Sequence, residues 1–142
     1  MLLKYGNFLE DVPNGNINNS VSVFINSCGT YKLSQDKDMT TERIDGRKDY
    51  QLIYIADGQG TFFFDKNQST VIKAGSIVIF RPDEYQKYIY FGNDKPQIYW
   101  IHFTGNNIEE ILKNKISEDE LNLLKNHIKN VEKFPFFDPN LQ

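Results

Sequence analysis

The chain has 142 residues, of which 39% are hydrophobic and 25% charged, and these values are typical of one globular domain. Its formal net charge is −3 without a basic stripe, which argues against tight binding of nucleic acid by this chain alone. No apolar run reaches the roughly 18 residues of a membrane span, and the single cysteine cannot form an internal disulfide, so we expect a cytoplasmic protein with no membrane partner.

The first 49 residues carry weak signals. Residues 14–19 are polar and turn-prone, which predicts a loop. Residues 21–27 form the first expected strand, because their apolar side chains alternate. We interpret Cys28 as a small buried residue rather than a reactive thiol, since no second cysteine or base is near it in the sequence. Residues 31–46 are polar and predict at most an edge strand at 39–44.

Six short segments between residues 50 and 103 form the strongest pattern in the chain. They are rich in Ile, Val, Tyr and Phe, and Gly, Pro or Asn turns close each of them. The expected strands are 50–57, 61–65, 69–73, 76–80, 86–91 and 97–103. Strands at this spacing predict a mainly β domain, a small barrel or sandwich that can enclose one ligand-sized cavity.

After residue 105 the spacing of the apolar residues changes to that of a helix. Asn106 or Asn107 is a suitable cap for a short helix, and Ser117 and Glu120 form a capping box that predicts a second one. The second helix carries a narrow apolar seam: Leu121, Leu124, Ile128 and Val131. The seam covers fewer than two heptads, so docking on the chain's own β domain and pairing in a dimer both remain open.

The patterns of metal-dependent and nucleophilic enzymes are missing from this sequence. The only two histidines, His102 and His127, fall in separate elements, and no paired cysteine accompanies them. No nucleophile elbow or phosphate-binding glycine loop occurs, and Asp83 and Glu84 fall in an expected turn. We therefore expect no metal, no cofactor and no catalytic residue.

Aromatic rings and arginines are instead concentrated in the β region. Arg43, Arg47 and Arg81 are the only arginines among 16 basic residues, and the planar guanidinium offers a fork of donors that lysine lacks. Aromatic rings add flat apolar walls with polar tips. Together they suit a polyol or a sugar. Each residue also has a plainer interpretation, a core position for a ring and a surface ion pair for an arginine.

Four motifs in a fixed order carry a resemblance to a known family. They are Arg43 with the run from Arg47 to Ile55, then Gly58-Gln59-Gly60, then residues 74–82, and then residues 99–105. Over about residues 20–105 they resemble the N-terminal ligand-sensing domain of AraC-type transcription regulators. The resemblance implies a cupin-like β-barrel or double-stranded β-sandwich over residues 1–105. C-terminal α-helices that pack or dimerise would follow over residues 106–142.

The resemblance also implies a function. A small polar effector, by analogy a sugar, would bind inside a metal-free barrel, and the chain would form a homodimer. DNA would be bound only through a C-terminal helix-turn-helix module that this chain does not include. The residues predicted to contact the effector are Arg43, Tyr88 and Trp100, by their positions in the motifs, with Arg47 and Gln86 beside them. Ile98 stands where a family member has a sugar-contacting histidine, so we expect different hydrogen bonds.

Two other functions stay open at this point. A cupin-type sugar-modifying enzyme would need a bound metal or an acid/base pair, which the sequence does not offer. A ligand-free dimerisation module would have a barrel filled by its own side chains.

Overall fold

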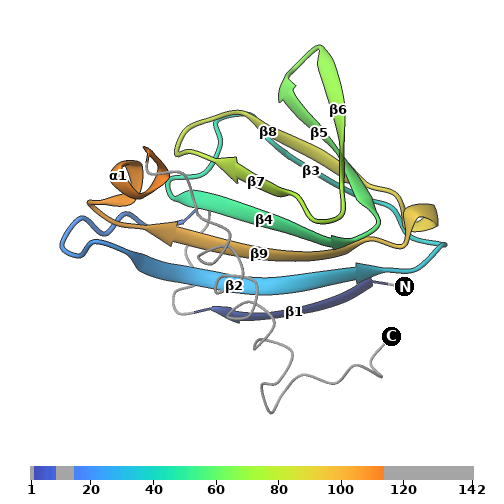
Figure 1. Ribbon diagram of the computed structural model, residues 1–142, viewed down its shortest axis with the longest axis horizontal. Coiled ribbons are helices and arrows are strands. Elements are labelled where there is room, and N and C mark those ends of the chain that lie inside the picture. The colour runs from blue at the N-terminus through green and yellow to red at the C-terminus, as the bar shows by residue number, and fades with distance from the viewer. Residues whose placement is uncertain (1, 9–14, 114–142) are drawn as a thin grey trace.

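The computed structural model describes residues 2–8 and 15–113, with side chains from residue 15 onward (Figure 1). The strands are β1 (Leu2–Phe8), β2 (Phe24–Leu33), β3 (Met39–Arg43), β4 (Tyr50–Asp57), β5 (Gln59–Asp65), β6 (Gln68–Lys73), β7 (Ile77–Phe80), β8 (Gln86–Tyr90) and β9 (Gln97–Thr104). The helices are the 3₁₀ helix η1 (Gly92–Asp94) and α1 (Ile108–Lys113). In these ranges no helix has the length and apolar character needed to cross a membrane.

The strands form two antiparallel sheets that lie face to face. One sheet has the order β1-β2-β9-β4-β7, and the other has the order β3-β8-β5-β6. The β5–β6 hairpin projects beyond the rest of its sheet, as Figure 1 shows. This arrangement confirms the mainly β fold that the sequence predicts.

The central strands β4 and β9 are buried on both faces of their sheet. Ile53 pairs with Trp100 on the inner face, while Leu52 pairs with Ile101 on the outer face. A strand buried on two sides cannot show polar–apolar alternation. This explains why both segments appear in the sequence as nearly continuous apolar runs.

The inner core between the sheets is dominated by aromatic rings. Phe62 on β5 is fully buried, and its ring centroid lies 5.5 Å from that of Tyr88, 6.1 Å from that of Tyr90 and 6.4 Å from that of Phe80. The last contact joins the two sheets. Aromatic pairs in such tilted and edge arrangements each add about 0.5–1.5 kcal/mol beyond their area burial.

The outer face of the five-stranded sheet carries a second apolar cluster. Its buried members are Leu52, Tyr54, Tyr99 and Ile101. Cys28 is half-buried and packs against this cluster, so it is less enclosed than the sequence suggested. The residues predicted for dimerisation lie outside the described part of the chain: Leu121, Leu124, Ile128 and Val131.

The sequence located the central strands well and the first strands poorly. The strand predicted at 21–27 begins only at Phe24, and Val21 and Val23 are 40% and 46% exposed. The backbone carbonyl of Val21 accepts a hydrogen bond from the amide of Asn106, just before α1, instead of joining the sheet. In addition, β2 continues to Leu33 because β1 and β9 pair with it on both sides, which its polar composition did not indicate.

Candidate functional site

Polar side chains meet at one end of the space between the two sheets. Arg43 is the last residue of β3 and pairs in register with Gln86, the first residue of β8. Arg43 Nη1 donates to Gln86 Oε1 at 2.9 Å and to Tyr88 Oη at 3.2 Å. Three of the five predicted effector-contacting residues are thus brought into direct contact.

The five-stranded sheet supplies the other side of this cluster. Gln51 on β4 donates from Nε2 to Tyr88 Oη at 3.2 Å, so the tyrosine hydroxyl joins the two sheets. Gln51 pairs in register with His102, and His102 Nδ1 lies 2.9 Å from Ser27 Oγ on β2. A continuous polar row therefore faces Arg43 from the opposite layer.

Two buried amide atoms in this cluster have no hydrogen-bond partner in the described part of the chain. They are Gln86 Nε2 and Gln51 Oε1, on side chains that belong to residues only 0% and 3% exposed. Because Arg43 donates to Gln86 Oε1, the Gln86 amide is oriented with Nε2 as its unpartnered donor, and the Gln51 amide that donates to Tyr88 Oη presents Oε1 as an unpartnered acceptor. An unmet buried polar group costs about 1–3 kcal/mol. The site therefore offers one donor and one acceptor to a bound molecule.

Trp100 lies next to the cluster as an aromatic wall. Its ring stacks on His102 at a centroid distance of 4.6 Å and contacts Tyr31 at 6.0 Å. Trp100 is only 3% exposed and belongs to the inner core. Trp100 is therefore a core residue, and its contact with an effector stays a prediction.

Arg47, the fifth predicted residue, is engaged in a separate buried ion pair. Arg47 Nε and Nη2 donate to the Asp49 carboxylate at 2.7 and 3.2 Å, and Asn26 Nδ2 donates to it at 2.8 Å. Asp49 is fully buried. Gly15 has a φ of +95°, and a Cβ there would lie 2.3 Å from Asp49 Oδ2, so the ion pair fits only against a glycine.

The sequence missed Gln51 as a site residue. It is the one long polar side chain within the apolar run of β4, where an unpaired amide is costly. A lone glutamine in such a run is the signal that could have identified it. His102, interpreted from sequence as part of the barrel wall, does hydrogen-bond within the wall, through Ser27.

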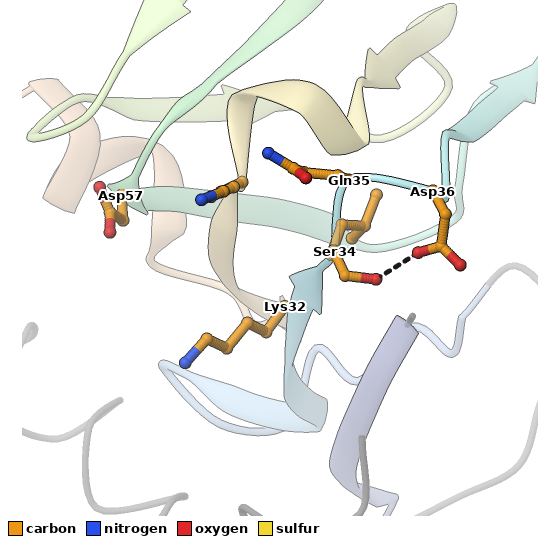
Figure 2. A pocket seen from close by; sticks show the side chains of 7 residues that line it. Lys32, Ser34, Gln35, Asp36 and Asp57 are labelled. Atoms are coloured by element: carbon orange, nitrogen blue, oxygen red, sulfur yellow. Dashed lines mark hydrogen bonds between the residues drawn. The ribbon is translucent and has the colours of Figure 1, made fainter.

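A separate surface pocket of about 590 Å³ lies at the opposite end of the strands. Figure 2 shows Lys32, Ser34, Gln35, Asp36 and Asp57 around it, with Ser34 Oγ donating to Asp36 at 2.6 Å. Its lining mixes charges of both signs and includes no aromatic ring. The Arg43 cluster instead combines buried polar groups with the Trp100 ring, so we take it as the candidate site. The described residues include no group of three His, Cys, Asp or Glu side chains that could hold a metal.

The half-buried Tyr31 and the buried Tyr90 make the fold sensitive to high pH. Burial raises the pKa of Tyr31 to about 12, with Tyr88 adding to the rise and Arg43 and Arg47 opposing it. Burial likewise raises the pKa of Tyr90 well above 10. The folded state thus favours the protonated phenol, and this contribution is complete below about pH 10 and lost as pH rises toward about 12.

We expect the free energy of unfolding to fall between about pH 10 and pH 12, and Tyr31→Phe to make this fall shallower. Urea melts at several pH values, together with tyrosinate absorbance, measure both effects. An equally steep fall in Tyr31→Phe would show that Tyr31 does not contribute to it.

Comparison with known proteins connects this arrangement to a family. The family model of the AraC-like ligand binding domain matches residues 25–133. No curated protein matches the chain. Three similar solved structures are a cupin superfamily protein from Desulfitobacterium hafniense DCB-2, the cupin domain of Schizosaccharomyces pombe Cnp3 and an HTH_3 family transcriptional regulator from Vibrio cholerae.

All three structures are distant in sequence. The D. hafniense protein is 13% identical with a TM-score of 0.49, and the match covers 73% of this chain and 78% of that one. The S. pombe domain is 14% identical with a TM-score of 0.48, covering 71% and 63%. The V. cholerae regulator is 13% identical with a TM-score of 0.42, covering 58% and 43%.

Proposed function

Because the chain belongs to the AraC-like ligand-binding domain family, we propose that it senses a small polar metabolite, a sugar or a sugar derivative, bound between its two sheets. The unpartnered amide atoms of Gln51 and Gln86 are the observation that carries this proposal. Binding would be relayed to a DNA-binding helix-turn-helix module outside residues 1–142.

The chemistry of the cluster suits a hydroxylated molecule. A hydroxyl group both donates and accepts, so it can meet the Gln86 donor and the Gln51 acceptor at once. The Trp100 and Tyr31 rings provide an apolar wall beside these groups. The groups joined by hydrogen bonds around Tyr88 are two amides and a guanidinium, which favours binding over catalysis.

A thermal-shift panel of neutral sugars and sugar acids, with and without EDTA, tests this function. A ligand at about 100 times its Kd adds roughly 2.7 kcal/mol of stability, which raises Tm by several degrees. We expect Gln86→Leu to fold but to lose the shift, because it removes the unpartnered donor and keeps most of the volume. Gln35→Leu, in the surface pocket at the opposite end, should keep the shift.

Three results would count against the sensor. A shift that survives in Gln86→Leu would place the ligand elsewhere. A shift that requires metal would favour the cupin-type enzyme. No shift from any compound would favour the ligand-free dimerisation module.

We also propose that the seam of Leu121, Leu124, Ile128 and Val131 buries apolar surface, in a homodimer or on the chain's own β domain. The second possibility is supported by the apolar outer face of the five-stranded sheet.

The double variant Leu124→Asp with Ile128→Asp distinguishes the dimer from docking on the β domain. If the seam forms a dimer, the molecular mass measured by sedimentation equilibrium should fall to that of the monomer, with little loss of monomer stability. A docked helix predicts an unchanged mass and a Tm lower by several degrees. An unchanged mass and Tm would exclude both.

A further inference from the structure

Arg43 carries a positive charge that no carboxylate balances within residues 15–113. The ion pairs in this range are Arg47–Asp49, Lys48–Asp83, Arg81–Glu109, Lys87–Glu42 and Lys113–Glu110. Arg43 is thus the one arginine of the described chain without an acidic partner, although it is half-buried. Both of its hydrogen bonds run from Nη1 to neutral oxygens, and its Nε and Nη2 donors make none with the described residues.

Glu42 and Asp49 have other partners, and Asp45, on the exposed turn after β3, forms no ion pair with Arg43. Glu42 precedes Arg43 on β3, so its side chain points to the other face of the sheet, where it accepts from Tyr85 Oη at 2.9 Å and lies 3.7 Å from Lys87 Nζ. Asp49 is held by Arg47 and Asn26. The cluster around Arg43 therefore has a net positive charge.

A half-buried cation without a counter-ion favours an anionic partner, because pairing compensates for its lost hydration. The free donors of Arg43 belong to the planar fork, which matches the two oxygens of a carboxylate. A single unpaired arginine suits one negative charge better than the two of a phosphate monoester. The amides of Gln51 and Gln86 would meet hydroxyl groups of the same molecule.

We propose that the effector is a polyhydroxylated carboxylic acid, of the sugar-acid class, with its carboxylate on Arg43 and a hydroxyl group between Gln51 and Gln86. This inference rests on the proposed sensor function and narrows its ligand. It does not require a metal or a chemical step.

Isothermal titration calorimetry with matched compounds tests the inference. Glucose is compared with glucuronate and gluconate, and galactose with galacturonate. Glucose and galactose are also compared with glucose 6-phosphate and galactose 6-phosphate. We expect at least one acid to bind roughly tenfold to a hundredfold more tightly than its neutral twin, as a charge-assisted hydrogen bond allows. Raising the salt concentration should weaken the binding of the acid and leave the binding of the neutral sugar unchanged.

Variants assign the preference to Arg43. Arg43→Gln should abolish the difference between acid and neutral twin, and Arg43→Lys should retain part of it, because lysine keeps the charge without the fork. Arg81→Gln is the matched control, since Arg81 is already paired with Glu109 on the surface, and it should behave as the wild type. Thermal melts confirm that each variant is folded.

The other outcomes separate this inference from the sensor function. A neutral sugar that binds as tightly as its acid overturns the inference and leaves the sensor function intact. A preference for the 6-phosphate overturns the assignment to a carboxylate. An acid preference that persists in Arg43→Gln overturns the role of Arg43. If no sugar, sugar acid or sugar phosphate binds, both the inference and the proposed sugar sensor fail.

Discussion

Replacing Asp49 with alanine is expected to lower the free energy of unfolding by about 3–5 kcal/mol, because it leaves the buried Arg47 guanidinium without its counter-charge. Asp49 is 0% exposed, and its carboxylate also accepts from Asn26. The loss corresponds to a decrease in Tm on the order of 10–20 °C for a domain of this size. Differential scanning calorimetry and urea melts measure it.

The control for this variant is Asp83→Asn, because Asp83 has a φ of +64°, a conformation that asparagine tolerates better than alanine. Asp83 pairs with Lys48 at 3.1 Å, but both side chains are at least 60% exposed, so the loss should be within about 1 kcal/mol. The double variant Arg47→Met with Asp49→Leu removes both charges and should recover most of the stability. Equal losses of stability in Asp49→Ala and Asp83→Asn would show that burial does not strengthen the Arg47–Asp49 pair.

The ion pair also matters for the position of the site. Asp49 precedes β4 directly, and Gln51 follows two residues later with its side chain in the polar cluster. Asn26 lies on β2 and donates both to Asp49 and to the backbone carbonyl of Asn16. Asp49 therefore fixes the start of β4 relative to β2, and we interpret Arg47 as a positioning residue rather than a contact residue.

The strands from residue 50 to 103 could be predicted from sequence because turn residues separate compact apolar segments at regular spacing. The first strand could not, because β1 is defined by its pairing with β2 and not by an apolar pattern. The polar end of β2 was missed for the same reason. Pairing on both sides satisfies the backbone hydrogen bonds of β2 whatever its side chains are.

The candidate site was predicted only in part, because it depends on register across two sheets. Arg43, Gln86 and Tyr88 lie on neighbouring strands of one sheet, and the sequence predicted Arg43 and Tyr88 by their positions in the motifs with Gln86 beside them. Gln51 reaches them from the other sheet, which no spacing within one segment indicates. Arg47 was predicted beside these residues because it is an arginine at the start of the run from Arg47 to Ile55. Its engagement with Asp49 depends on the path of the loop before β4.

Replacing Trp100 with alanine is expected to destabilise the fold by about 3–5 kcal/mol, since a buried indole leaves a large cavity. Trp100 packs in the inner core between His102 and Tyr31. A loss of ligand response in this variant would therefore not distinguish a pocket residue from a core residue. Urea melts measure the loss of stability directly, and a loss below about 1 kcal/mol would contradict the core assignment.

Trp100→Phe resolves the ambiguity, because it keeps an aromatic ring in the core and removes the indole edge. We expect it to lose less than half the stability lost by Trp100→Ala and to weaken ligand binding measurably. Trp100 is the only tryptophan in the chain, so its fluorescence reports on this wall alone in the wild type. A ligand held by Arg43 and Gln86 should change that fluorescence as it saturates. If saturating ligand leaves the fluorescence unchanged and Trp100→Phe binds normally, Trp100 acts only in the core and does not contact the ligand.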